Sequence, residues 1–273
     1  MKMNLKKFRS MRILPVLVLA LGMTTIVSCN SDDDSNDGSA RIKVSMTDAP
    51  GDYDAVYVDV TDVMINADAT VDGDAGWKSL SGVKTGVYDL LELTGGVSQL
   101  LADTDVPAGY LGQIRLVLGD NNNVVIDGET QPLSTPSAQQ SGLKIKVNQD
   151  LAAGETYNFL LDFDVDKSVV KAGSSGGFML KPVIRVSNGV ESGSIKGSVH
   201  PTTFQSVVQV QNATTTVSAY TDVAGNFELK GVPAGIYQLK VTPSIASGLT
   251  VKTMNDVEVK TGETLDLETI FLE

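Results

Sequence analysis

Three aspartates at alternate positions, Asp162, Asp164 and Asp166, have the type and spacing that invite metal chemistry in this chain of 273 residues. Carboxylate oxygens are hard ligands of the kind that Ca²⁺ prefers. An EF-hand loop that begins at Asp162 would need Gly at its sixth position and Glu at its twelfth. The sequence has Lys167 and Gly173 there, so an EF-hand is excluded.

Two interpretations of this acidic segment stay open. Asp48 or Asp120 could be brought near by folding to complete a calcium site of another kind, which is the only cofactor the sequence allows us to consider. Alternatively, the acids form the solvent face of a strand whose Phe163 and Val165 face a core. Like charges on one strand face need a compensating cation, and three basic residues are near in sequence: Lys167, Lys181 and Arg185.

Nucleophilic and zinc chemistry find little support. The run Gly173-Ser174-Ser175-Gly176-Gly177 matches G-x-S-x-G, but a hydrolase elbow needs a helix after it and a His partner. A strand pattern follows instead, and the only histidine, His200, lies in a later segment beside Pro201, where we expect an exposed strand end. One His and a single Cys are also too few for the usual His and Cys ligand sets of zinc. We therefore predict no catalytic residue.

Trp77 is the only tryptophan, and it follows the turn-like sequence Asp72-Gly73-Asp74-Ala75-Gly76. Three interpretations of it stay open: a hydrophobic plug at the end of a sandwich, a platform that stacks on a sugar, or a contact with another protein. Glycosidases combine paired carboxylates with aromatic platforms, and the aromatic residues here are few and scattered. Trp77 is thus a candidate ligand-binding residue but does not indicate glycoside hydrolysis.

The secondary-structure elements that position these residues are predicted to be short strands, because apolar residues recur at every second position in many segments from Arg41 onward. In the first part the alternating segments are Ile42–Met46, Val56–Val60, Ile114–Leu118, Val124–Ile126, Leu143–Val147, Phe159–Val165 and Phe178–Val186. In the second part they are Ser194–Val199, Thr215–Tyr220, Asn226–Leu229, Ile236–Thr242, Leu249–Val259 and Thr264–Leu272. Glycine-rich and asparagine-rich turns separate them, which predicts an all-β fold of two β-sandwich domains, residues 40–188 and 193–273. We expect one short helix, around Gly96–Leu101.

Charge and cysteine content exclude some classes of partner and bond. The net charge is −12 and every acidic residue lies after position 28, so the folded part repels phosphate backbones and nucleic acid is not an expected partner. Cys29 is the only cysteine, so no disulfide forms within the chain. The stability of both domains must therefore come from their cores.

The first 28 residues have the pattern of a signal peptide. Residues 2–12 are basic, Ile13–Val27 is apolar but too short for a confident membrane span, and the run ends Ile26-Val27-Ser28-Cys29. An apolar residue and small residues before Cys are the pattern that lipoprotein signal peptidase reads. We therefore predict cleavage before Cys29 and a diacylated cysteine that anchors the protein stably to a membrane. The alternative is a short N-terminal helix with a chance cysteine.

Residues 29–39 contain the predicted lipid site and an acidic segment without apolar side chains, which is typical of a disordered tether. Ser31-Asp32-Asp33-Asp34 resembles the surface-export signal of Bacteroidota lipoproteins. That resemblance implies an outer-membrane lipoprotein that faces the cell exterior. Retention on the periplasmic face is the alternative.

The last 80 residues resemble the carboxypeptidase regulatory-like domain, a transthyretin-like β-sandwich related to starch-binding modules. The residues that carry this are Gly197-Ser198-Val199, Thr221–Leu229 and Gly231–Val241. Asp222 and Gly225 suit a hairpin turn, with Phe227 and Leu229 facing the core. The resemblance implies an accessory module without catalytic residues. The loosely patterned segment Pro201–Ala213 departs from the family.

Residues 40–188 resemble an uncharacterised lipoprotein family called domain of unknown function 4382. The motifs that carry this are Val44–Pro50, Gln113–Leu116, Pro136–Lys144, Asp162–Ser168 and Leu180–Arg185. The resemblance implies a β-rich surface domain with no assigned activity. We therefore expect a non-enzymatic surface module that contacts glycan or protein, with an adhesin or assembly subunit as the alternative and a surface hydrolase third.

Overall fold

The structure is a computed structural model that describes residues 38–70, 73–135, 142–173, 176–189 and 191–273. The predicted signal peptide, Cys29 and most of the tether lie outside the described residues, as do Asp72, the two serines of the G-x-S-x-G run and residues 136–141. Asn36–Glu273 forms one compact unit. Strands dominate the described part, which confirms the all-β prediction. No helix in the described ranges is long and apolar enough to cross a membrane.

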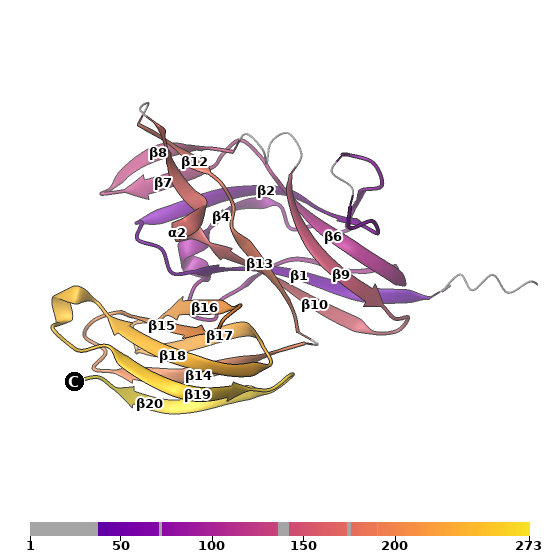
Figure 1. Cartoon of the computed structure of the whole chain (residues 1–273). Helices are drawn as coiled ribbons and strands as arrows, with labels where there is room; N and C mark the ends of the chain where they lie inside the picture. Colours follow the sequence, from indigo (N-terminus) through magenta and orange to yellow (C-terminus); the bar gives the residue numbers. More distant parts are fainter. Residues whose placement is uncertain (1–37, 71–72, 136–141, 174–175, 190) are drawn as a thin grey trace, which may run out of the picture. The chain divides into compact units, whose positions relative to one another are not determined.

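Thirteen strands build two sheets around the first hydrophobic core (Figure 1). One sheet has the order β13-β10-β1-β5, and the other runs β11-β12-β8-β7-β2-β6-β9, with β3 and β4 paired to β2. The strands are β1 (Ser39–Ala49), β2 (Ala55–Asn66), β3 (Lys78–Ser79), β4 (Gly86–Asp89), β5 (Gln99–Pro107), β6 (Gly109–Leu118), β7 (Asn123–Ile126), β8 (Glu129–Ser134), β9 (Leu143–Leu151), β10 (Thr156–Asp164), β11 (Val169–Ala172), β12 (Gly177–Leu180) and β13 (Ile184–Asn188). In the connections that the structure describes, two short helices join them, η1 (Leu90–Leu93) and α2 (Val165–Ser168).

The central pair of the smaller sheet shows why the alternating sequence folds this way. β1 and β10 are parallel, and Val44 lies opposite Phe159 while Met46 lies opposite Leu161. All four side chains are almost completely buried. Because side chains of a strand alternate between faces, one register directs the apolar residues of both strands into the same core. Each such side chain contributes about 1.5–3 kcal/mol relative to an exposed one.

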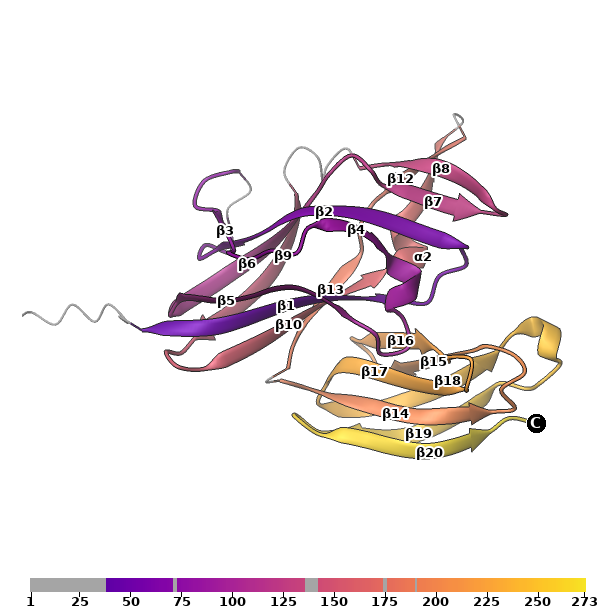
Figure 2. The ribbon, with the colours of Figure 1, turned by 180° about the vertical axis from the view of Figure 1, so that it is seen from behind.

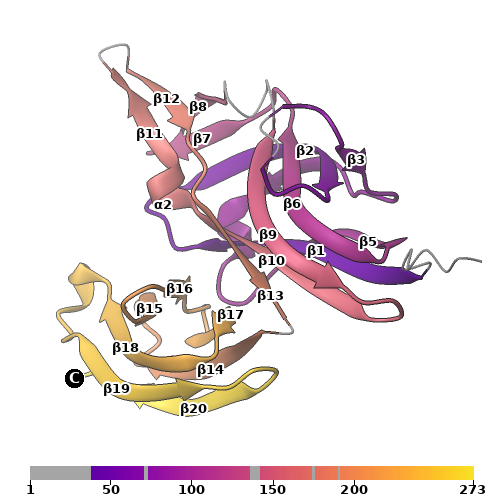
Figure 3. The ribbon, with the colours of Figure 1, turned by 45° about the vertical axis from the view of Figure 1, so that its right-hand side comes forward.

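Seven further strands enclose a second hydrophobic core, seen from two directions in Figures 2 and 3. The strand orders of its two sheets are β17-β14-β20 and β16-β15-β18-β19. The strands are β14 (Ser192–His200), β15 (Ser206–Gln211), β16 (Thr216–Tyr220), β17 (Asn226–Pro233), β18 (Gly235–Pro243), β19 (Lys252–Val259) and β20 (Thr264–Phe271), with the short helix η3 (Ile245–Ser247) before β19. The predicted turn at Asp222 and Gly225 is present, since the Gly225 amide donates to the Asp222 carbonyl at 2.9 Å. It is not a hairpin, because β16 and β17 belong to different sheets, and the turn carries the chain from one sheet to the other.

The helix predicted around Gly96–Leu101 is wrong. Gly95 and Gly96 have φ of +65° and +94°, values that a helix does not allow, and β5 begins at Gln99. The helical turn lies earlier, at η1, where the Asp89 side chain accepts a hydrogen bond from the Leu91 amide. Leu101 faces the core as part of the strand, so its apparent helical spacing came from a turn followed by a strand.

Two other segments differ from the predicted strands. β15 lies inside the loosely patterned segment and occupies an inner position of its sheet, between β16 and β18. Its Val208 and Val210 are fully buried, but the inward position before them holds Ser206 and an outward position holds Val207, so the alternation of apolar and polar residues is short and broken. The segment 178–186 is two strands rather than one, since residues 181–183, which include Pro182, are not in a ladder.

Candidate ligand-binding cleft

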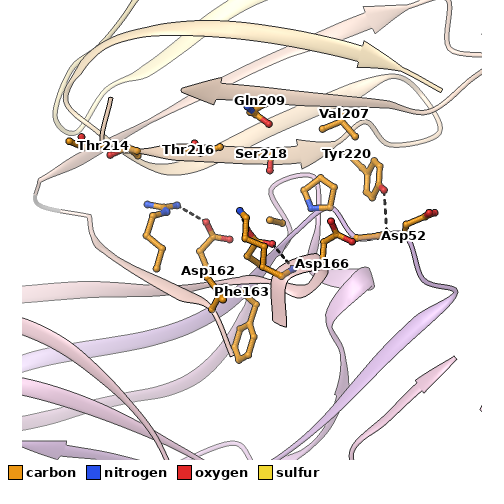
Figure 4. A pocket seen from close by; sticks show the side chains of 18 residues that line it. Asp52, Asp162, Phe163, Asp166, Val207, Gln209, Thr214, Thr216, Ser218 and Tyr220 are labelled. Atoms are coloured by element: carbon orange, nitrogen blue, oxygen red, sulfur yellow. Dashed lines mark hydrogen bonds and ion pairs between the residues drawn. The ribbon is translucent and has the colours of Figure 1, made fainter. Parts of the chain in front are cut away.

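A polar cleft of about 500 Å³ opens where the ends of β1 and β10 meet the outward face of β15 and β16 (Figure 4). The connection from β1 to β2, helix α2 and strand β13 complete its wall. Its charged residues are Asp52, Asp162, Asp164, Asp166, Lys167 and Arg185, and its neutral polar side chains are Gln209, Thr214, Thr215, Thr216, Ser218 and Tyr220. All three predicted metal-site aspartates line this cleft.

Asp162 is buried at the back of the cleft and is paired with a cation. It lies opposite Arg185 in the β10–β13 ladder, and the Arg185 Nη2 to Asp162 Oδ2 distance is 2.6 Å. Burial raises the pKa of Asp162, and the neighbouring guanidinium opposes that shift. The interpretation of an acidic strand face toward solvent is therefore wrong for Asp162, because antiparallel pairing with β13 supplies the compensating cation inside the fold.

Asp164 and Asp166 do not share a strand face with Asp162. β10 ends at Asp164, whose carboxylate caps α2 by accepting from the Lys167 amide at 3.1 Å and also pairs with the Lys167 ammonium. Asp166 lies in the first turn of α2. Val165, predicted to face the core from a strand, is fully buried but from this helix. The helical turn therefore breaks the alternation on which the three-carboxylate pattern rested.

Asp48 is brought beside this segment, as one calcium interpretation required. It is the penultimate residue of β1, lies opposite Phe163 and is only 3% exposed. Its Oδ1 accepts from the Val165 amide at 3.2 Å, and burial, helped by the charges of Asp162 and Asp164, raises the pKa of Asp48 to about 9. A carboxyl with that pKa is neutral at pH 7 and acts as a hydrogen-bonding group rather than as an anion.

The geometry does not gather these acids around one point. Within the described ranges, no three side chains of His, Cys, Asp or Glu are arranged to hold a metal ion. Asp120, the other candidate, follows β6 in the connection to β7 and is not part of the cleft wall. What the arrangement offers is a concave surface with fixed hydrogen-bond acceptors from carboxylates and mixed donors and acceptors from hydroxyl and amide groups.

The side of the cleft formed by β15 and β16 contributes neutral hydrogen-bonding groups. Tyr220 donates its phenol proton to the Gly51 carbonyl at 3.2 Å, which links β16 to the β1–β2 connection. Burial, with the charges of Asp52 and Asp166, raises the pKa of Tyr220, so the phenol stays protonated. No sequence pattern marked Gln209, Ser218 or Tyr220, because alternation says that they face outward but not what they face.

Trp77 lies outside the cleft. Its ring packs under the Arg115 guanidinium at 4.1 Å, and its indole nitrogen donates to the Gly73 carbonyl at 3.1 Å. Arg115, whose side chain is 7% exposed, also pairs with Asp74 at 3.0 Å. Trp77 therefore fastens the segment before β3 onto β6 through a cation–π contact, and contact with a sugar or a protein stays a prediction.

His200 ends β14 and is exposed, as predicted, with its ring centroid 6.0 Å from that of Phe271.

Comparisons with known proteins identify the first part of the chain and show only remote likeness elsewhere. The sequence model of the family described as "Domain of unknown function (DUF4382)" matches residues 39–182. No curated protein matches this chain at a significant level. Among solved structures, a type II cohesin–X-dockerin interface mutant from Acetivibrio cellulolyticus is 25% identical over 29% of this chain and 56% of that chain, with a TM-score of 0.24. The match thus spans little more than half of that structure's length.

Two further structures match over most of this chain. The minor pilin GBS52 of Streptococcus agalactiae is 10% identical over 84% of this chain and 94% of that chain, with a TM-score of 0.24. A leucine-rich repeat protein from Bacteroides thetaiotaomicron is 13% identical over 85% of this chain and 26% of that chain, with a TM-score of 0.20. Similarity this remote carries no inference about activity or ligand.

Proposed function

We propose a surface-binding function for this chain, which belongs to the family described as "Domain of unknown function (DUF4382)". In this proposal the protein is a non-enzymatic lipoprotein of the outer membrane, anchored through Cys29 and facing the cell exterior. The signal-peptidase pattern that ends at Cys29 supports the lipid anchor. The acidic run Asp32-Asp33-Asp34 supports export to the cell surface. The second sandwich is the carboxypeptidase regulatory-like accessory module in this proposal.

The polar cleft is the observation that carries the binding function. Asp52 and Asp166 form no ion pair within the described part of the chain and project carboxylate acceptors from its wall (Figure 4). Ser218 and Gln209 on the opposite side add a hydroxyl and an amide. A hydroxyl-rich glycan or the polar surface of a protein has the hydrogen-bond donors and acceptors needed to pair with these carboxylate, hydroxyl and amide groups. Gln209 and Ser218 lie within strands and Asp166 lies within α2, so regular structure holds much of the site in place before a ligand binds.

Crosslinking on intact cells tests this proposal. The full chain, displayed on cells, is crosslinked, and the captured glycan or protein is identified. Ser218→Trp fills the cleft, and Thr253→Trp is the matched control on the exposed strand β19. We expect capture to be lost only in Ser218→Trp. Added protease should digest the protein on intact cells. Equal capture by both variants would overturn the cleft as the binding site, and full protection from protease would overturn surface display.

Assembly by strand addition is the second candidate, and the sheet edges of the second sandwich bear on it. β19 and β20 are edge strands, and each carries a bulge with a non-glycine residue of positive φ, Asp256 at +57° and Glu268 at +55°. Bulges of this kind are a common device against edge-to-edge pairing. The binding function is therefore better supported, and a monomeric soluble form in ultracentrifugation would agree with it.

A further inference from the structure

A second cavity, of about 720 Å³, opens at the end of the first core and differs in character from the polar cleft. Its floor is formed by Val106, Leu111 and Leu151, which belong to the core and are almost completely buried. The exposed ring of Tyr110 forms part of its wall. We refer to it as the apolar groove. The apolar surface that the groove leaves open to water belongs to Tyr110, which is 45% exposed, and to the exposed Pro107, and such a surface suits an apolar group.

The few polar side chains of the groove suit an amphiphile with an anionic head. Lys78 lines the groove and is exposed, so its ammonium is free to approach a phosphate. Asp68 also lines the groove and stays an anion, because the hydroxyl and amide of Thr70 donate to its carboxylate at 2.7 Å and lower its pKa. An anionic head is therefore expected on the Lys78 side of the groove. An extended peptide would need backbone partners along the whole groove, whereas an acyl chain needs none.

The start of the folded chain lies at this groove. The Ala108 amide donates to the Gly38 carbonyl at 2.8 Å, and Ser39 lies opposite Pro107 in the β1–β5 ladder. Ala108 and Pro107 both line the groove. Only residues 30–37 separate Gly38 from Cys29, a stretch that spans at most about 30 Å when fully extended. A lipid on Cys29 would therefore keep the groove within that distance of a bilayer.

We propose that the apolar groove takes up one acyl chain of an anionic bilayer lipid. The apolar floor receives the chain, and Lys78 faces the headgroup. Uptake covers the exposed apolar surface of Tyr110 and Pro107, and burial of that surface and of the acyl chain supplies the gain in free energy. The proposal rests on the proposed lipid anchor only for the source of the lipid, because the groove itself lies wholly within the folded unit.

The first experiment measures the groove without a membrane. Both hydrophobic cores lie within Asn36–Glu273, so this segment is expected to fold by itself. Parinaric acid, a fluorescent anionic acyl chain, is titrated into it. We expect saturable binding at one site, weakened about tenfold by Tyr110→Asp, which removes apolar wall. Lys78→Glu should also weaken it. Ile245→Asp, at a fully exposed apolar residue outside the groove, should not.

The second experiment tests the source of the lipid. The lipidated full chain is placed in vesicles of phosphatidylethanolamine and phosphatidylglycerol that contain a phosphatidylglycerol with a photoreactive group at the end of one acyl chain. We expect labelled peptides from 65–70 and 106–111, and loss of that label in Tyr110→Asp. Absence of saturable parinaric acid binding would overturn the acyl-chain site, and label found only outside the groove would overturn the bilayer source. If the tests of surface display or of ligand binding at the polar cleft fail, the expected binding of parinaric acid in the first experiment stays the same.

Discussion

Arg185 holds the buried Asp162 and, with the same guanidinium, reaches a strand of the second sandwich. Its Nη2 lies 2.6 Å from Asp162 Oδ2, and its Nη1 lies 2.5 Å from the carbonyl oxygen of Gly231 in β17. Asp162 is 8% exposed, so water solvates its carboxylate little and the guanidinium has to compensate its charge. One side chain therefore both neutralises the back of the polar cleft and bonds the two sandwiches to each other.

Replacing Arg185 should destabilise the protein through the charge that it leaves behind. In Arg185→Met we expect the free energy of unfolding to fall by about 3 kcal/mol, because Asp162 stays buried without its cation. Asp162→Asn added to that variant should recover part of the loss. Urea unfolding of Asn36–Glu273 measures both. Arg41→Met, which breaks an exposed pair with Asp103, is the control and should leave the midpoint unchanged. An unchanged midpoint in Arg185→Met would contradict this role.

Asp48 should make the protein less stable as the pH rises. Its folded pKa of about 9 lies above the usual value of 3.8, so between these values the unfolded state has released a proton that the folded state keeps. The free energy of unfolding then falls by up to about 1.4 kcal/mol per pH unit in this window, and is greatest below pH 4 as far as this group is concerned.

Asp48→Asn should remove that slope, because an amide mimics the protonated carboxyl and cannot ionise. Urea midpoints at pH 5, 7 and 9 measure the effect, and the variant should be the more stable protein at pH 9. Asp52→Asn, an exposed change in the same cleft, serves as the matched control and should keep the wild-type slope. Identical slopes in wild type and Asp48→Asn would show that Asp48 is not the group responsible.

The positions of most strands along the chain were predictable because local alternation decides which side chains can share a core. Val44 and Phe159 obey that rule in one ladder. Turn chemistry was predictable at Asp222 and Gly225, since the Gly225 φ of +83° is a conformation that glycine adopts without strain. β15 escaped prediction because Ser206 faces inward and Val207 faces outward, which leaves too short a run of alternating apolar and polar residues.

The cleft was predictable only in part. Asp162, Asp164 and Asp166 do line it, but alternation implied one shared face, and a helical turn after Asp164 removed it. Its second side comes from β15 and β16, and the Tyr220–Gly51 bond joins residues 169 positions apart. No local sequence pattern predicts such a contact, because it depends on how the two sandwich domains pack against each other.

The Asp222 turn should contribute measurably to the second sandwich. The carboxylate accepts from the amides of Ala224 and Asn226 at 2.9 and 2.8 Å and so fixes the turn that connects β16 in one sheet to β17 in the other. Asp222→Ala should lower the free energy of unfolding by about 1 kcal/mol, whereas Asp222→Asn keeps an acceptor oxygen and should lose less. Thermal unfolding of both variants measures the difference. Equal losses would mean that the charge, rather than the acceptor geometry, matters.

Trp77 should act on stability and leave ligand binding at the cleft unchanged. Trp77→Ala removes the ring beneath the Arg115 guanidinium and should lower the free energy of unfolding by about 1–2 kcal/mol, while Trp77→Phe keeps a weaker cation–π contact and should lose less. Retardation in polysaccharide gels separates this role from sugar stacking. If the ring is structural, both folded variants migrate as wild type does. If Trp77 stacks on a sugar, retardation disappears in Trp77→Ala even under conditions where unfolding shows that the variant is fully folded.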